Sequence, residues 1–295
     1  LGTAPVALAL AGCASLSTPD DITAATAQSL PALPPQWIVD GAAPGAVRIG
    51  WIESVGDPGL TQLVREAQAN NPDIRAAAAN LDASRALVQQ ARAALFPQIN
   101  ANVNADRTES PNPFALNQAV YTVAGQAQWE VDLWGRVRAG RNAAYASAQA
   151  VKADLRFAQY SLAAGVASAY FASIEAAQQV SVARRTVDAL AEIDRIVRVR
   201  YTEGFASRQD TATTGADYQA ARDNLAQAEN ASRNARRALE VLVGRYPADR
   251  VTLAQSLPLA PPPPPAGLPS ELLERRPDVI AAERRVAAAF ANLDQ

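Results

Sequence analysis

Two stretches of the chain alternate between polar and apolar residues with the period of two that is typical of β-strands. In "PQINANVNADR", Ile99 and Val103 share one side, while Asn100 and Asn102 share the other. The stretch "YTVAGQAQWEVDLW", residues 121–134, alternates in the same way. The segment between them, "TESPNPFALNQ", has the Pro, Asn and Ser content of a loop. The pattern predicts a β-hairpin with one polar and one apolar face.

Such a hairpin belongs either to a membrane protein or to a soluble domain that half-buries it, and both interpretations stay open here. Each strand is roughly ten to fourteen residues long, enough to cross an outer-membrane bilayer at a tilt. Aromatic residues near the strand ends suit membrane interfaces, and a polar face suits a water-filled lumen. The membrane interpretation places Tyr121, Trp129 and Trp134 at the interfaces, and Asn100, Asn102, Gln126, Gln128, Glu130 and Asp132 towards the lumen.

Two helices are predicted before the hairpin. Asp57 followed by Pro58 has the N-cap and first-turn chemistry of a helix that ends near residue 70. "Asn-Pro-Asp" from Asn71 starts a second helix, and Phe96 with Pro97 stops it after residue 95.

One very long helix follows the hairpin, over residues 136–203, where no Pro occurs; its length would be roughly 100 Å. Steps of four and three from Leu155 predict a coiled-coil seam that other helices must cover. The seam comprises Leu155, Gln159, Leu162, Val166, Ala169, Ser173, Ala176, Val180, Ala183, Val187, Leu190, Asp194, Val197 and Tyr201.

A turn and a shorter return helix, residues 208–245, are predicted next. Gly204 supplies a helix-ending conformation in "YTEGFASRQD". Ser207 is a suitable N-cap, with Asp210 three residues later as its capping-box partner. Residues 247–267 form a Pro-rich connector.

The beginning of the chain has the pattern of an export signal and a lipid anchor. Residues 1–12 are apolar and end in small residues, like the remnant of a signal peptide. "Leu-Ala-Gly-Cys" resembles the bacterial lipobox, which predicts that Cys13 carries a diacylglycerol; the alternative is a buried free cysteine. Ala14 and Ser15 after the cysteine imply export to the outer membrane, with residues 13–56 as a lipidated tether.

Composition argues against catalysis and against nucleic acid. The chain has 295 residues, no His and one Cys, so the usual general base and a thiolate metal site are missing. Its net charge is -2, which argues against nucleic acid as a partner. We expect no enzyme activity, catalytic residue, metal or cofactor. No run of 18 apolar residues exists that would form a membrane-spanning helix.

An internal repeat organises the rest. "NPDIRAAAANLDASRALVQQ" from Asn71 matches "RPDVIAAERRVAAAFANLDQ" from Arg276. We interpret residues 57–246 as a first repeat (helices 57–95, β-hairpin 96–134, long helix 136–203, return helix 208–245) and residues 268–295 as the start of a second. With no Met present, and with a second repeat that stops soon after it begins, we expect the sequence to be truncated at both ends. A lone hairpin leaves unpaired edges, so three chains with four strands each would close a twelve-stranded barrel.

Four segments in order resemble the outer-membrane efflux family, the TolC-like channels: "LFPQINANVNA", "WEVDLWGRVRAG", "RYTEGFASRQD" and "LPSELLERRPDVIAAERRV". The lipobox makes the chain similar to the lipid-anchored branch typified by OprM and NodT. The resemblance implies a mostly α-helical homotrimer with a transmembrane β-barrel in the outer membrane and a periplasmic tunnel. It also implies a passive exit duct for small toxic molecules, docked to a periplasmic adaptor and to an inner-membrane pump, of the RND type.

The resemblance assigns roles to two groups of residues. The turn becomes the tunnel tip that meets the adaptor: Tyr201, Gly204, Phe205, Ala206, Ser207 and Asp210. Phe96, Pro97 and Gly135 lie where the barrel bends into the tunnel. Two alternatives remain, a periplasmic adaptor and a lipid-anchored coiled-coil scaffold without a pore. The first would have short Gly-rich β segments, and the second leaves the alternation in 98–133 unexplained.

Overall fold

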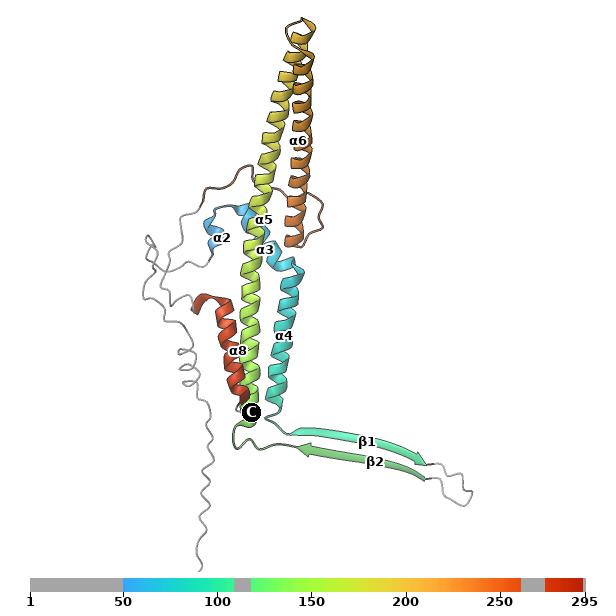
Figure 1. Ribbon diagram of the computed structural model, residues 1–295. Helices are drawn as coiled ribbons and strands as arrows, with labels where there is room; N and C mark the ends of the chain where they lie inside the picture. The colour runs from blue at the N-terminus through green and yellow to red at the C-terminus, as the bar shows by residue number, and fades with distance from the viewer. Residues whose placement is uncertain (1–49, 109–117, 261–273, 294–295) are drawn as a thin grey trace, which may run out of the picture. The chain divides into compact units, whose positions relative to one another are not determined.

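The computed structural model describes residues 50–108, 118–260 and 274–293. Its helices are α2 (Trp51–Ser54), α3 (Pro58–Asn70), α4 (Pro72–Ala93), α5 (Arg136–Thr202), α6 (Arg208–Val243) and α8 (Pro277–Leu293), and its strands are β1 (Gln98–Thr108) and β2 (Gln118–Gln128). The expected mostly helical fold with one long β-hairpin is confirmed (Figure 1). The described residues fall into two compact units, one of 50–79 and 154–260, the other of 80–108, 118–153 and 274–293.

The core of the first unit is built from α2, α3, α5, α6 and the segment after α6. Its buried residues are Ile52, Leu60, Leu63, Val64, Ala67, Ala163, Val166, Ala167, Tyr170, Ile174, Leu239, Val243 and Val251. The last part of the segment expected to form the tether packs on this core, because the burial of Ile52 holds α2 as a short helix against it.

Tyr170 joins three segments of this core through one hydroxyl group. The hydroxyl donates to Asp57 Oδ2 at 2.8 Å and accepts from the Ala254 backbone N–H at 3.3 Å. Burial, together with the neighbouring carboxylate, raises the pKa of Tyr170 to about 12. Asp57 also caps α3, since its Oδ1 accepts from the Gly59 and Leu60 N–H groups as predicted.

The predicted seam of α5 is confirmed. Every seam position from Leu155 to Val197 is buried or half-buried, and only Tyr201 at the helix end is exposed. The two polar positions that departed most from the pattern, Ser173 and Asp194, are 0% and 8% exposed. Asp194 accepts from Arg198 on its own helix and from the Thr214 hydroxyl of α6, at 2.6 and 3.2 Å. The return helix therefore lies side by side with α5 at this part of the seam (Figure 1).

The segment after α6 is fixed by a buried carboxylate. Glu240, 2% exposed, accepts from the backbone N–H groups of Asp249, Arg250 and Val251 at 2.7, 2.6 and 3.0 Å. Gly244 ends α6 with φ +85°, and Arg245 then pairs with Glu66 of α3. These contacts turn the chain back onto the core immediately after the helix.

In the second unit, α4 leads into β1, and β2 leads into α5 (Figure 1). The prediction that α4 reaches residue 95 is wrong by two residues. Leu95 and Phe96 donate to carbonyls only three residues back, because Pro97 disfavours helical geometry in the residue before it. Helix α8 begins at Pro277 with Asp278 in its first turn, matching Pro72 and Asp73 of α4. That the two helices open two repeats stays a prediction.

Candidate functional site

The hairpin sorts its side chains onto two faces. The strands pair antiparallel, with Asn100 opposite Gln126 and Val103 opposite Val123. Even-numbered residues of one strand oppose even-numbered residues of the other, so all the predicted polar positions within the strands share one face. Each strand has 11 residues, within the expected range.

The apolar face is exposed throughout. Ile99, Val103, Tyr121 and Val123 are 73–80% exposed, and none of the described residues covers them. A face of β-branched and aromatic side chains in water is unfavourable by roughly 25 cal/mol for each Å² of apolar surface. The hairpin therefore requires an apolar environment on one side and a polar one on the other.

The second strand ends earlier than its alternation predicts. β2 stops at Gln128, so Glu130 and Asp132 do not lie on a strand face, and their placement there is corrected. The cause is the start of α5, which uses both carboxylates. Asp132 accepts from the N–H groups of Val137 and Arg138 at 3.2 and 3.0 Å. It thus caps a helix whose own N-cap position is a glycine.

Gly135 makes this capping possible. Its φ of +88° is a left-handed conformation that glycine adopts readily, and it reverses the chain so that Asp132 reaches the first turn of α5. Gly135 lies in the bend between strand and helix, and its place at a junction of barrel and tunnel stays a prediction. Phe96 and Pro97 occupy the matching bend between α4 and β1, and Phe96 is 60% exposed.

The two carboxylates also form ion pairs at this junction. Glu130 binds Arg136 through two hydrogen bonds of 3.0 and 2.6 Å, and the pair lowers the pKa of Glu130. Burial raises the pKa of Asp132, but hydrogen bonds from the Arg138 and Val137 N–H groups and from the Arg138 side chain outweigh it, so the net shift is downward. Both groups are therefore charged at neutral pH.

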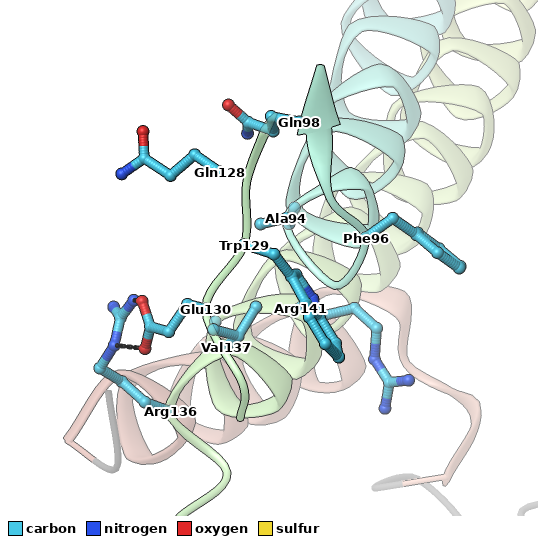
Figure 2. Close-up of a pocket in the computed structure, with 11 residues that line it drawn as sticks. Ala94, Phe96, Gln98, Gln128, Trp129, Glu130, Arg136, Val137 and Arg141 are labelled. Carbon is cyan, nitrogen blue, oxygen red and sulfur yellow. Dashed lines mark hydrogen bonds and ion pairs between the residues drawn. The ribbon is translucent and has the colours of Figure 1, made fainter. Parts of the chain in front are cut away.

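A cavity of about 310 Å³ lies at the junction, where Trp129, the residue after β2, bonds to the segment that follows α4 (Figure 2). The Trp129 indole N–H donates to the Leu95 carbonyl at 3.2 Å. The cavity is lined by Ala91, Ala94, Phe96, Gln98, Gln128, Trp129, Glu130, Arg136, Val137, Gly140 and Arg141. Of the predicted interfacial aromatics, Trp129 is 55% exposed, Trp134 79% and Tyr121 78%. Their contact with a membrane interface stays a prediction.

The turn between α5 and α6 has the predicted chemistry. Gly204, at φ +82°, donates to the Tyr201 carbonyl, and Phe205 donates to Arg200, which together close α5 as a Schellman motif. Ser207 and Asp210 form the expected capping box. Hydrogen bonds from the Ser207 backbone and hydroxyl lower the pKa of Asp210. Hydrogen bonds therefore fix the helix ends on both sides of this exposed turn.

This hydrogen-bonded turn presents an apolar side chain to the solvent. Phe205 is 81% exposed and Tyr201 45% exposed. Ala206 is half-buried, whereas Gly204, Ser207 and Asp210 are exposed. The structure thus brings the six predicted tip residues together, while their role in binding a partner stays untested.

Sequence reasoning missed two features of the junction. One is Arg141 as a lining residue of the cavity, and the other is the capping of α5 by Asp132. The signal for Asp132 was present, because Gly135 offers no side chain to cap α5 and a carboxylate stands three residues before it. Cys13 lies outside the described residues. Within those residues, no cluster of His, Cys, Asp and Glu suits a metal ion. No helix in the described ranges combines the length and the apolar character that crossing a bilayer demands.

The chain is similar to known proteins both in sequence and in fold. The model of the family described as outer membrane efflux protein matches residues 63–245. The toluene efflux pump outer membrane protein TtgC of Pseudomonas putida is 32% identical over 99% of this chain and 62% of its own length. The pyoverdine export outer membrane protein OpmQ of Pseudomonas aeruginosa is 31% identical over 97% of this chain and 62% of its own length.

A solved structure of the outer-membrane channel OprN superposes with a TM-score of 0.72 and 29% identity, over 89% of this chain and 63% of that one. The chain thus spans less than two thirds of the length of these relatives. The expected family and outer-membrane location are confirmed, and the family is one of channels. The chain belongs to the outer membrane efflux protein family.

Proposed function

We propose that the protein is the outer-membrane channel subunit of a tripartite efflux system. It serves as a passive exit duct for small toxic molecules, and an inner-membrane pump supplies the energy through a periplasmic adaptor. The relatives' names support the substrate class, since one is named for toluene efflux and another for antibiotic efflux. We also propose that the channel is a lipid-anchored homotrimer, because a two-stranded sheet leaves two edges unpaired and a bilayer tolerates none.

One observation carries this proposal: the hairpin has a fully exposed apolar face backed by a face of Asn and Gln side chains. Strands of 11 residues fit the length that a tilted transmembrane strand needs. Lipid on one side and water on the other satisfy both faces together. Neither an adaptor nor a pore-free scaffold gives the apolar face a partner, and family membership argues further against the adaptor.

Spin labels on the hairpin test this proposal. Single cysteines at Val103 and Val123 should place labels in lipid, where oxygen relaxes them. Cysteines at Asn102 and Gln126 should place labels in water, where a soluble nickel complex relaxes them. Paramagnetic accessibility in reconstituted membranes measures both, and the same sample should have the mass of a trimer. If no label senses lipid, or if the two pairs are interchanged, the channel interpretation fails.

The adaptor contact has its own test at the tip. Replacing Gly204 with valine forces a β-branched residue into φ +82°, so the turn must change shape. No atom lies within 4 Å of the added Cβ, so the effect acts through the backbone. We expect the Kd for the adaptor to rise about ten-fold, which corresponds to a loss of about 1.4 kcal/mol of binding free energy. Trimer assembly should stay unchanged.

Gly56 is the matched control for Gly204. It has φ +71° and open space around the Cβ position, but it lies next to α3 and away from the turn. Gly56→Val should leave adaptor affinity unchanged in surface plasmon resonance. Equal adaptor affinity for Gly204→Val and the wild type would remove the tip from the proposed interface.

A further inference from the structure

Three arginines lie in the first two turns of α5, a position that normally disfavours positive charge. Arg136, Arg138 and Arg141 face the partial positive charge of the helix N-terminus. Glu130 neutralises Arg136, and Asp132 neutralises Arg138 at 3.0 Å. No carboxylate of the described residues pairs with Arg141, whose Nε and Nη2 donate only to the Asn142 side-chain oxygen, at 3.2 and 2.7 Å. The stability of the helix does not account for this third charge.

Arg141 lines the junction cavity together with two exposed aromatic side chains, those of Phe96 and Trp129. The side-chain amides of Gln98 and Gln128 also line the cavity, but they belong to the polar face of the hairpin, which the proposed function turns towards the lumen. The N–H groups of the first turn of α5 are not available, since Asp132 occupies those of Val137 and Arg138. Glu130, the one carboxylate of the cavity lining, is already held by Arg136. Figure 2 shows the Arg141 side chain pointing away from Gln98 and Gln128, so on that side the cavity offers an anion one unneutralised guanidinium group.

The position of the cavity indicates the source of the anion. It adjoins the first residue of β1 and the last residue of β2, so it lies where the proposed membrane-spanning strands end. Trp129 and Phe96 line it and are 55% and 60% exposed, as aromatic side chains at headgroup level are. Phosphate groups of lipids are the anions present at that level.

We propose that this junction cavity binds the phosphate of an anionic phospholipid headgroup, with Arg141 as its charged ligand. The inference rests on the proposed membrane-spanning role of the hairpin. Guanidinium groups suit phosphate because they offer paired donors in a fixed plane. Lipid bound here would hold the junction at a fixed depth in the membrane.

Lipid titration of the full-length protein tests the proposal. Detergent-purified wild type, Arg141→Gln and Arg141→Lys are mixed with phosphatidylglycerol or phosphatidylcholine, and retained lipid is counted by native mass spectrometry. We expect the wild type to prefer phosphatidylglycerol by about five-fold, the contribution of one basic side chain near an anionic surface. Arg141→Gln should lose the preference, and Arg141→Lys should keep part of it.

Arg75→Gln is the matched control, because Arg75 is exposed on α4 and lies outside the cavity. An Arg141→Gln protein that retains phosphatidylglycerol like the wild type overturns the proposal. So does full displacement of the lipid by inorganic phosphate, which would assign the site to a soluble anion. A wild type that neither fractionates with outer membranes nor forms trimers contradicts the proposed function instead, so the two failures are distinguishable.

Discussion

Replacing Glu240 with alanine should destabilise the protein by about 3 kcal/mol. Three backbone N–H groups, those of Asp249, Arg250 and Val251, donate to this buried carboxylate. Alanine leaves all three without an acceptor in a place that water reaches poorly, and each unpaired buried group is unfavourable by about 1–3 kcal/mol before relaxation. Urea unfolding followed by circular dichroism at 222 nm measures the change.

Glu229→Ala is the matched control, because Glu229 is on the same helix and bonds to Arg184 at a partly exposed site. Its loss should shift stability by no more than about 1 kcal/mol. Hydrogen exchange adds a local readout, since the amides of 249–251 should lose protection in Glu240→Ala and keep it in Glu229→Ala. Unchanged protection in Glu240→Ala would show that the carboxylate does not hold the segment.

The same site gives a pH dependence with a definite sign. Burial raises the pKa of Glu240, but the backbone donors outweigh it and lower the pKa below its ordinary 4.5. A lowered folded-state pKa means that the stabilisation is present above the unfolded value and is lost as the pH falls through the folded value. The stability gap between wild type and Glu240→Gln should therefore be constant near neutrality and narrow below about pH 4.5.

Gly244→Ala should have an effect of similar size for a steric reason. The residue has φ +85°, a conformation that is unfavourable for alanine by roughly 1–2 kcal/mol. The added Cβ would also lie 2.9 Å from the backbone oxygen of Asn70, which cannot move without displacing the end of α3. We expect a loss of about 2–4 kcal/mol in the same urea experiment.

Gly204→Ala separates the effect of the backbone conformation from the effect of the steric contact. Gly204 has nearly the same φ as Gly244, +82°, but no neighbouring atom lies within 4 Å of its Cβ position. This variant should lose only the roughly 1–2 kcal/mol of unfolding free energy that the left-handed backbone conformation accounts for. If the two alanine variants are equally stable, the contact between Gly244 and Asn70 has no energetic weight.

Local chemistry made several elements predictable. Asp57 before Pro58, and Ser207 before Asp210, satisfy the free N–H groups of a helix start with side chains only two or three residues away. The α5 seam was equally readable, because a helix that packs along its whole length repeats one spacing throughout. Asp194 fits the spacing of the seam but is not apolar, and its burial follows the spacing.

The features that sequence did not reveal depend on pairs far apart in the chain or on competition between neighbours. Glu240 is an ordinary helix residue until the chain folds back on it nine to eleven residues later. The alternating pattern continues through residue 133, but the strand ends at Gln128. Beyond it, Asp132 caps α5 and Glu130 forms an ion pair with Arg136. The junction cavity draws on two helices and two strands, so no single stretch of sequence announces it.

The parity of the hairpin register limits how its length can drift during evolution. Gln98 faces Gln128 and Asn104 faces Thr122, so partners across the sheet are always both even or both odd. Losing or gaining one residue within a strand would turn every later side chain to the wrong solvent, whereas a change of two would preserve the sorting. Homologous hairpins should therefore differ in strand length by pairs of residues, and single-residue changes should be confined to the loop.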